Sequence, residues 1–430
     1  MERELIRELQ KWKKRKRRKP LIIKGARQVG KTWLMKEFGQ RFFENVAYIN
    51  CDNNENVRNI FEMDYQIPRI ISALQIESHQ QIQPDKTLII FDEIQEVPKA
   101  LSCLKYFCEE APEYAIVAAG SLLGIALHEG TSFPVGKVDF MELHPMSFSE
   151  FLRAVGEEGL ADALQGDDYT LVNSFAPKYT ELLRRYYYVG GMPEVVAEYA
   201  ENGDFFEVQR LQRQILDYYM EDFSKHAPER DVPRIHMVWN SIPAQLAREN
   251  RKFLYGSLRE GARAKDFEIA IQWLEDCGLI HRSYRVKKPG MPLNAYADMS
   301  AFKMYMLDVG LLVAKSELAP EVLLQGNRMF TEFKGALTEQ FVAQELCVSN
   351  RSLYYFAKEK SDGEIDFMLQ KGMDIIPLEV KAEENLQAKS LKAYCAEFAP
   401  QQAVRTSLSK YRKEDWMTNV PLYLLRAFLA

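Results

Sequence analysis

Cysteine is scarce in this chain, and none of it stands at the spacing of a metal site. The 430 residues contain six cysteines, far apart except for Cys103 and Cys108, and no His or Cys pair near those two has zinc-ligand spacing. We therefore interpret the cysteines as reduced, mostly buried thiols of a cytosolic protein.

Long hydrophobic runs are also missing. The N-terminus MERELIRELQ is amphipathic and charged, so it lacks the apolar core of a signal peptide. The longest apolar run, AIVAAGSLLGIAL, contains Gly and Ser and is too short to span a bilayer. We expect a cytoplasmic protein that does not reside in a membrane.

A strong net charge is absent, although charge is unevenly distributed. The formal net charge is −5, which argues neither for nor against a polyanionic partner. The tract KWKKRKRRK, from Lys11 to Lys19, is almost wholly basic, and a second basic-leaning region lies between Arg248 and Lys288. Such tracts are either solvated faces or contacts for nucleic-acid phosphates, so DNA is a candidate partner.

A phosphate-binding loop follows the basic tract directly. In KPLIIKGARQVGKTWLMKEF, an apolar strand runs into a glycine-bearing turn and then a helical pattern, which matches G-x-x-x-x-G-K-[ST]. Gly25 and Gly30 allow backbone N–H groups to surround phosphate oxygens, and the helix N-terminus adds its dipole. We expect Lys31 to reach the β- and γ-phosphates and Thr32 to offer its hydroxyl to Mg²⁺. The predicted nucleotide-binding residues are Gly25, Ala26, Arg27, Gln28, Val29, Gly30, Lys31, Thr32 and Trp33.

A second motif strengthens this prediction. The segment KTLIIFDEIQEVP is an apolar run that ends in Asp92 and Glu93, as expected for a parallel strand of a doubly wound sheet. We expect Asp92 to hold the magnesium ion through its water shell and Glu93 to polarise the attacking water. A strand in INCDNNENV would lie between the two motifs, and this pattern favours hydrolysis over kinase chemistry.

A third apolar run, YAIVAAGS, ends in Ser121. A small polar side chain at the C-terminal tip of such a strand faces the crevice where these sheets bind ligands, so Ser121 either senses the γ-phosphate or is an ordinary turn serine. Residues 1–155 are thus predicted to form a parallel α/β nucleotide-binding domain.

Five motifs in order, GARQVGKT, LIIFDEIQ, AAGSLLG, HPMSFSEFL and YVGGMPEVV, resemble the prokaryotic P-loop ATPases of the AAA superfamily whose C-terminal half is a domain of unknown function. The resemblance covers essentially the whole chain. It implies a sheet of the ASCE/AAA type and ATP as the nucleotide. By similarity to the Gly-x-Pro motif of related ATPases it implies that Gly191 and Pro193 adjoin the adenine, unless this loop only opens a helix at Pro193.

The chain departs from these relatives at one place. Many of them carry Gly-Arg after the sensor segment, whereas this chain has PVGKVDF, with Lys137 at the comparable place. The arginine finger that would act across a homo-oligomer is therefore unassigned, with Arg184 and Arg185 as candidates only.

The middle of the chain reads first as a helical lid, residues 156–232, in which the aromatics Tyr186, Tyr187 and Tyr218 are expected to be core. Two helices and a hairpin around Pro289-Gly290 then predict a winged-helix domain, residues 233–318. Winged helices bind DNA or serve as packing modules, and here acidic residues on the candidate recognition helix weaken DNA contact. The wing cations strengthen it: Arg282, Arg285, Lys287 and Lys288.

The last region, residues 319–430, reads as a helix, three strands and another helix. The helix TEFKGALTEQFVAQEL carries Glu339, and GEIDFMLQ, read as one strand, carries Asp366. On the strand DIIPLEVKAEE, Glu379 and Lys381 are two apart and project together. Pro377 in this strand would require an edge position or a bulge.

This order of an acid on a helix, then Asp, then Glu-x-Lys resembles the PD-(D/E)xK nuclease fold, a small α/β restriction-endonuclease-like domain. The resemblance implies that Asp366 and Glu379 ligate Mg²⁺ or Mn²⁺, that Glu339 completes the metal shell, and that Lys381 activates water. Related domains can keep the scaffold and lose the activity. Two functions therefore stay open: an ATPase coupled to a nuclease-like domain that acts on or binds DNA, and an ATP-dependent STAND-like switch that recognises a protein partner without cleavage.

Overall fold

The computed structural model describes residues 1–121, 133–248, 251–325, 331–358, 363–383 and 387–429. Residues 122–124 of the motif AAGSLLG lie outside these ranges. Among the described residues, no helix is long and apolar enough to cross a membrane. The described chain divides into two compact units, residues 2–144 with 276–278, and residue 1 with 145–275 and 279–430.

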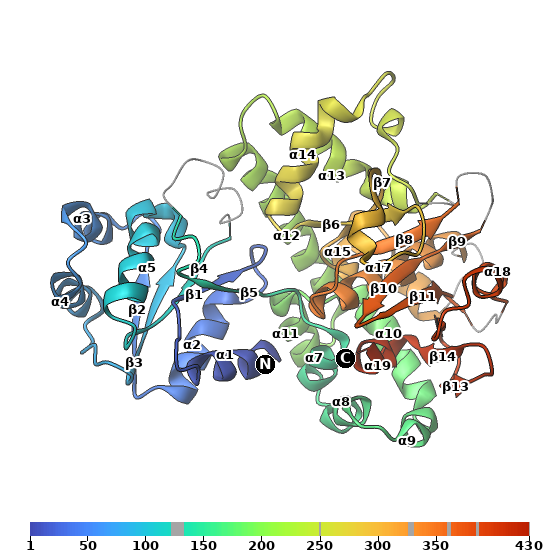
Figure 1. Ribbon diagram of the computed structural model, residues 1–430, viewed down its shortest axis with the longest axis horizontal. Coiled ribbons are helices and arrows are strands. Elements are labelled where there is room, and N and C mark those ends of the chain that lie inside the picture. Colours follow the sequence, from blue (N-terminus) through green and yellow to red (C-terminus); the bar gives the residue numbers. More distant parts are fainter. Residues whose placement is uncertain (122–132, 249–250, 326–330, 359–362, 384–386, 430) are drawn as a thin grey trace. The chain divides into compact units, whose positions relative to one another are not determined.

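The first unit is built on a parallel sheet with the strand order β2-β3-β4-β1-β5 (Figure 1). The central strands are buried on both faces, which explains their unbroken Leu, Ile, Val and Ala runs. Its elements are α1 (Leu5–Lys13), β1 (Leu21–Lys24), α2 (Lys31–Phe42), β2 (Asn45–Asn50), α3 (Glu55–Met63), α4 (Ile67–Ser78), β3 (Thr87–Asp92), α5 (Pro98–Glu110), β4 (Ala115–Ala119) and β5 (Asp139–Glu142).

The strand predicted in INCDNNENV was misplaced. Strand β2 ends at Asn50, and the Asn-rich stretch forms a turn in which the Asn54 side chain accepts a hydrogen bond from the Val57 N–H and caps α3. Strand β2 lies at the edge of the sheet, and β4 separates β1 from β3. Asp92 and Glu93 therefore follow a strand that is not the immediate neighbour of the phosphate-loop strand.

The second unit begins with a helical region, as predicted. Tyr186 and Tyr187 are buried in it, whereas Tyr218 is exposed, so the expectation that Tyr218 belongs to the core was wrong. The helices are α7 (Phe148–Ala154), α8 (Glu158–Gln165), α9 (Tyr169–Ser174), α10 (Ala176–Val189), α11 (Pro193–Asn202), α12 (Phe205–His226), α13 (Val232–Leu246) and α14 (Ala264–Asp276).

The hairpin that follows α14 does not stand alone. Strands β6 (Ile280–Val286) and β7 (Ala297–Met306) pair as predicted, but β6 also pairs in parallel with β8 (Tyr354–Ala357), which continues to β9 (Glu364–Ile365). This four-stranded sheet joins residues from both sides of the boundary predicted at 318/319. Between its strands lie the helices α15 (Val309–Lys315), α16 (Pro320–Gln325) and α17 (Thr331–Val348).

A second, mixed sheet completes this unit, with the order β10-β11-β12-β14-β13. The predicted strand GEIDFMLQ is broken at Asp366, because β9 belongs to the four-stranded sheet and β10 to this mixed sheet. Strand β11 is internal rather than at an edge, yet its pairing with β12 begins only at Leu378, one residue after Pro377. The elements are β10 (Phe367–Lys371), β11 (Asp374–Val380), α18 (Lys389–Phe398), β12 (Val404–Ser407), β13 (Arg412–Lys413), β14 (Thr418–Pro421) and α19 (Leu425–Leu429).

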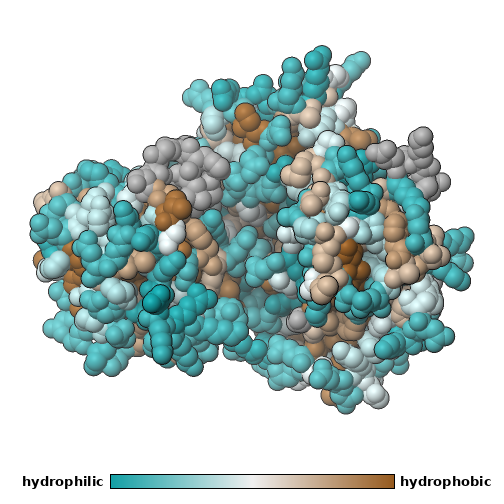
Figure 2. All heavy atoms as spheres, viewed as in Figure 1, coloured by the Kyte–Doolittle hydropathy of each residue, from teal (hydrophilic) through white to brown (hydrophobic). Residues whose placement is uncertain are grey.

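The surface gives little indication of a site by hydropathy alone. On the face drawn in Figure 2, hydrophilic side chains predominate and hydrophobic ones gather only in small patches. The candidate sites are therefore built from their polar side chains.

Candidate functional site

The phosphate loop in the first unit has the backbone that its motif predicts. Gly25, Gln28 and Gly30 all have positive φ angles, 143°, 63° and 91°, which turn the loop around its own N–H groups. A Cβ atom at Gly25 would lie 2.2 Å from the Leu143 carbonyl oxygen, so only glycine fits there. The loop ends at the N-terminus of α2, where the helix dipole favours an anion.

Lys31 lies inside this loop and is 7% exposed. Its ammonium group donates to the carbonyl oxygens of Gly25 and Ala26 at 2.8 and 2.7 Å. Burial lowers the pKa of Lys31 to about 8, although Glu93 and Asp92 oppose this shift. The amine is therefore held by neutral carbonyls, and its charge is not taken up by an ion pair.

Asp92 joins the two nucleotide motifs. Its Oδ2 atom accepts hydrogen bonds from the Thr32 hydroxyl at 2.6 Å and from the Tyr48 hydroxyl at 2.9 Å. Both donors are neutral, so the carboxylate keeps its charge for a hard cation. A hydroxyl and a carboxylate are suitable donors for Mg²⁺, and the pair fits the ion that the motif implies.

Glu93 is held in a strained conformation. Its φ angle is +51°, and its Oε2 atom accepts from Gln95 Nε2 at 2.7 Å and from the Ser121 N–H at 3.2 Å. Ser121 Oγ also lies 3.2 Å from this carboxylate and accepts from Arg27 Nε at 3.2 Å. Burial would raise the pKa of Glu93, but the hydrogen bonds and Lys31 outweigh it, so the pKa is lowered.

The remaining predicted residues are distributed around this centre. Ala26 and Val29 are buried, and Trp33 is exposed. The sequence interpretation missed Tyr48 and Arg3, whose guanidinium donates to the carbonyl oxygen of Val29 at 2.8 Å. Tyr48 lies on β2, which runs parallel to β3 and pairs Asn50 with Asp92, an arrangement of strands that the sequence does not reveal.

The loop with Gly191 and Pro193 belongs to the second unit, where it is tied into the core. The Gly191 N–H donates to Asp308 Oδ2 at 2.6 Å, and its carbonyl accepts from the Met146 N–H at 2.7 Å. Pro193 is the first residue of α11. Its place beside an adenine stays a prediction. Of the arginine-finger candidates, Arg185 pairs with Glu181 at 2.5 Å and donates to the Tyr199 hydroxyl at 3.1 Å.

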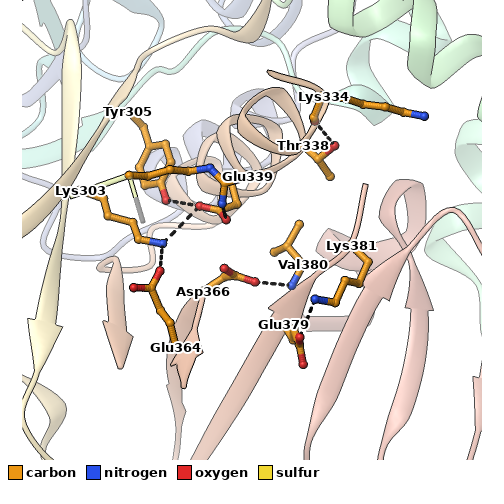
Figure 3. Close-up of polar contacts among 11 residues, drawn as sticks. Lys303, Tyr305, Lys334, Thr338, Glu339, Glu364, Asp366, Glu379, Val380 and Lys381 are labelled. Carbon is orange, nitrogen blue, oxygen red and sulfur yellow. Dashed lines mark hydrogen bonds and ion pairs between the residues drawn. The ribbon is translucent and has the colours of Figure 1, made fainter. Parts of the chain in front are cut away.

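The predicted carboxylate site in the second unit is arranged differently (Figure 3). Asp366, Glu379 and Lys381 line one pocket of about 600 Å³ together with Glu339. Yet among the described residues, no three His, Cys, Asp or Glu side chains stand close enough together to hold a metal ion. The predicted metal shell is therefore not assembled in this arrangement.

Glu379 is bound to the lysine that was predicted beside it. Its Oε1 atom lies 2.7 Å from the Lys381 ammonium, and its Oε2 atom accepts from the Leu391 N–H, in the first turn of α18, at 3.2 Å. The prediction that the two side chains project together is confirmed. Glu379 itself is buried rather than at the surface of the sheet.

Glu339 is surrounded by donors that the sequence interpretation missed. Its Oε2 atom accepts from the Tyr305 hydroxyl at 3.0 Å and from Lys303 Nζ at 3.4 Å, and its Oε1 atom accepts from Arg251. Lys303 also pairs with Glu364 Oε1 at 2.5 Å. Burial would raise the pKa of Glu339, but Lys303 and Arg251 outweigh it and lower the pKa to about 2.

Asp366 lies at the break between β9 and β10 and has a neutral partner. Its Oδ2 atom accepts from the Val380 N–H at 2.7 Å. Burial and the adjacent Glu339 carboxylate, to which it is hydrogen-bonded, raise the pKa of Asp366 well above its usual range. Asp366 is thus stabilised in its protonated form beside the ionised Glu339.

Comparisons with known protein families separate the N-terminal nucleotide-binding region from the rest of the chain. A model of a family described as an AAA domain matches residues 17–152, which include both nucleotide motifs. The N-terminal region is an AAA-type P-loop ATPase domain. Two models of domains of unknown function, DUF8612 and DUF4143, match residues 180–322 and 334–425. No curated protein matches the chain.

Three solved structures with a similar fold are distant in sequence from this chain. A Walker-type ATPase of Pyrococcus abyssi is 15% identical, with 73% of this chain and 95% of that chain covered and a TM-score of 0.46. The Orc1 protein of Aeropyrum pernix, solved in complex with DNA, is 15% identical over 73% and 91%, with a TM-score of 0.29. The RuvB Holliday junction branch migration motor of Thermotoga maritima is 13% identical over 66% and 90%, with a TM-score of 0.30.

Proposed function

We propose that this protein is an ATP-hydrolysing conformational switch whose C-terminal nuclease-like domain binds a protein partner and does not cut DNA. Glu93 would orient the attacking water, Lys31 would contact the transferred phosphate, and Ser121 would hold Glu93 in place. A magnesium ion held by Thr32 and Asp92 would offset phosphate charge. The observation that carries the ATPase part is the neutral-donor setting of Asp92 and Glu93 beside Lys31.

Helix α17 supports the coupling part, because it connects the carboxylate pocket with the helical region of its own unit. Glu339 faces the pocket, and the next turn carries Gln344 and Glu345. Glu345 Oε1 accepts from the Phe148 N–H at 2.8 Å, and Gln344 Nε2 donates to the Tyr186 hydroxyl at 2.9 Å. These are buried hydrogen bonds, so a movement of either side alters the other.

The chain itself links this helical region to the phosphate loop. The Leu143 N–H donates to the carbonyl oxygen of Lys24, the residue before Gly25, at 2.8 Å. Only a few residues separate Leu143 from Phe148, which Glu345 holds. A change in the phosphate loop therefore has a short path along the chain to Phe148 and from there, through the hydrogen bond with Glu345, to α17.

The predicted DNA-binding cations are largely engaged within the chain, which favours a protein partner. Arg282 forms an ion pair with Glu275, and Arg285 pairs with Asp298 at 2.5 Å. The hairpin that carries both arginines is joined to β8 along β6. Such a hairpin supports a packing role over that of a free DNA-binding wing.

Cleavage of DNA is the second candidate, and one observation favours it. Asp366, Glu379 and Lys381 line the same pocket, as the resemblance to PD-(D/E)xK nucleases implies. For cutting, their present partners would have to be exchanged for a divalent ion and a phosphodiester.

Hydrogen–deuterium exchange on the full chain tests the coupling. We expect Glu93→Gln, saturated with Mg-ATP, to change the exchange of residues 331–348 relative to the ADP state. Glu345→Gln, which weakens the hydrogen bond to the Phe148 N–H, should reduce this difference. Glu397→Gln, which affects only an exposed ion pair with Lys358, serves as the control. Equal exchange of α17 in both nucleotide states would contradict the coupling, and Mn²⁺-dependent cutting of DNA by the natural chain would favour the second candidate.

A further inference from the structure

A fully buried lysine, Lys303, contacts two acids that line the carboxylate pocket, Glu339 and Glu364. Lys303 on β7 is 0% exposed and lies within the apolar run Phe302–Met306. Its ammonium group contacts Glu364 Oε1 at 2.5 Å and Glu339 Oε2 at 3.4 Å, and it lies 5.1 Å from the centre of the Tyr355 ring. Isolated charges are not tolerated at such burial, so these carboxylates and the lysine stabilise one another.

The geometry of β7 directs the Lys303 side chain toward the acids of the carboxylate pocket. Side chains two apart on a strand face the same side, and both Lys303 and Tyr305 reach Glu339 on α17 (Figure 3). Arg251, from a segment that pairs with β7 through the Lys252–Lys303 bridge, takes the other Glu339 oxygen. Each oxygen of Glu339 is thereby occupied by a donor from this chain.

We propose that Lys303, assisted by Arg251, supplies the positive charge for the acids of this pocket and takes the role that a divalent ion has in a metal-dependent nuclease. The acids Glu339 and Glu364 are then held by an ammonium group, and the site keeps its structure without metal. The inference deepens the proposal that the C-terminal domain does not cut, and it is independent of ATP hydrolysis by the other unit.

The same arrangement predicts what removal of the lysine would do. Lys303→Met keeps the length of the side chain and its apolar stem but removes the ammonium group from Glu339, which adjoins Asp366, and from Glu364. The carboxylate oxygens that the ammonium group occupied would then be free to bind a hard divalent cation. Lys303→Met should therefore acquire a Mn²⁺ site at this pocket.

Mn²⁺ binding by nucleotide-free, full-length protein, followed by the loss of the free Mn²⁺ signal in electron paramagnetic resonance, tests the proposal. We expect Lys303→Met to bind Mn²⁺ at least about tenfold more tightly than the natural chain, and Lys303→Met with Asp366→Asn to lose this gain. Lys358→Met, at the same pocket but paired with Glu397 at its exposed rim, should behave like the natural chain.

A second measurement keeps the proposal testable should Lys303→Met not fold. In the otherwise natural chain, Glu339→Gln and Asp366→Asn should leave Mn²⁺ binding unchanged, because no metal is held there. A natural chain that binds Mn²⁺ and loses it in either variant would overturn the inference, as would a folded Lys303→Met that binds no more Mn²⁺ than the natural chain. Neither result would touch the ATPase proposal, whose readout is phosphate release.

Discussion

The two acidic sites of this protein differ in what holds their carboxylates. Asp92 and Glu93 accept hydrogen bonds from hydroxyls, an amide and a backbone N–H, all of them neutral. Glu339 and Glu379 also accept from neutral donors, the Tyr305 hydroxyl and the Leu391 N–H, but each of them is in addition held by cations: Arg251 and Lys303 at Glu339, and Lys381 at Glu379. Neutral donors orient a carboxylate and leave its charge available for an ion, whereas cationic donors neutralise it.

This difference separates two kinds of acidic cluster that look alike in sequence. Both sites have two or more acids near a lysine at the end of a buried strand. In the nucleotide site, however, the lysine is bound to carbonyl oxygens, so acids and amine remain ready for a magnesium ion and phosphates. We infer that the partner of the lysine, and not the number of acids, indicates whether such a site takes a metal.

The largest expected effect is on ATP hydrolysis. Lys31→Ala and Glu93→Gln should each lower the rate of phosphate release by about 10²–10³-fold, the range seen when a preorganised charge-stabilising group is removed. Glu93→Gln should still bind ATP, because the phosphate loop is intact. Lys86→Ala, which breaks an exposed pair with Glu44 in the same unit, is the control. Unchanged turnover in both variants would show that these residues are not the catalytic centre.

The largest expected change in the free energy of unfolding comes from replacing Lys303, beside the carboxylate pocket. Lys303→Met leaves Glu339 and Glu364 without their buried cation, and removal of one partner of a buried ion pair costs about 3–5 kcal/mol. Urea unfolding of the full chain, without added metal, measures this change. The exposed pair of Lys358 with Glu397 should matter little, so Lys358→Met provides the comparison. A similar small effect for both lysines would remove the distinction between the two kinds of site.

A smaller effect is expected from the residue that holds Glu93. Ser121→Ala removes the hydroxyl contact at 3.2 Å but keeps the backbone N–H donor, so kcat should fall by about tenfold or less, which corresponds to one hydrogen bond. KM should change little. Ser72→Ala, on the exposed face of α4, should have no effect. A full loss of activity in Ser121→Ala would mean that the hydroxyl itself contacts the phosphate.

The smallest expected effect is the pH dependence that arises from the lowered pKa of Lys31. The pKa of Lys31 is about 8 in the folded chain, below its usual 10.5, so between these values the unfolded state holds more protons and stability rises with pH. Below pH 8 both states are protonated, and the cost of burying the charge is fully present. Phosphates would raise this pKa again, so ATP binding at pH 8–9 should take up protons, measured by calorimetry in buffers of different ionisation enthalpy. Lys31→Ala should abolish the uptake.

The fold around the nucleotide could be predicted well because its signals are local. Buried parallel strands have unbroken apolar runs, and the motif from Gly25 to Thr32 specifies a backbone shape as well as side chains. The order of the strands could not be predicted, because nothing in the sequence places β4 between β1 and β3. Tyr48 was missed for the same reason, since its contact with Asp92 depends on which strands are neighbours.

The carboxylate site was predicted in its acids and missed in its cations. Asp366, Glu379 and Lys381 lie within one short stretch, whereas Arg251 and Lys303 come from segments far away in the chain. One signal was nevertheless present. Lys303 interrupts the apolar run AFKMYML, and a lysine on a buried strand requires an acid facing it. The break at Asp366 had no such signal, because it depends on the strand changing from one sheet to the other.

The most direct test of the account is the number of Mn²⁺ ions bound by the Glu93→Gln chain when it is saturated with ATP, counted by metal analysis after gel filtration. The account predicts one ion per chain, which is lost in the Asp92→Asn background and kept in the Asp366→Asn background. Two ions per chain, with one of them lost when Asp366 is replaced, would contradict it.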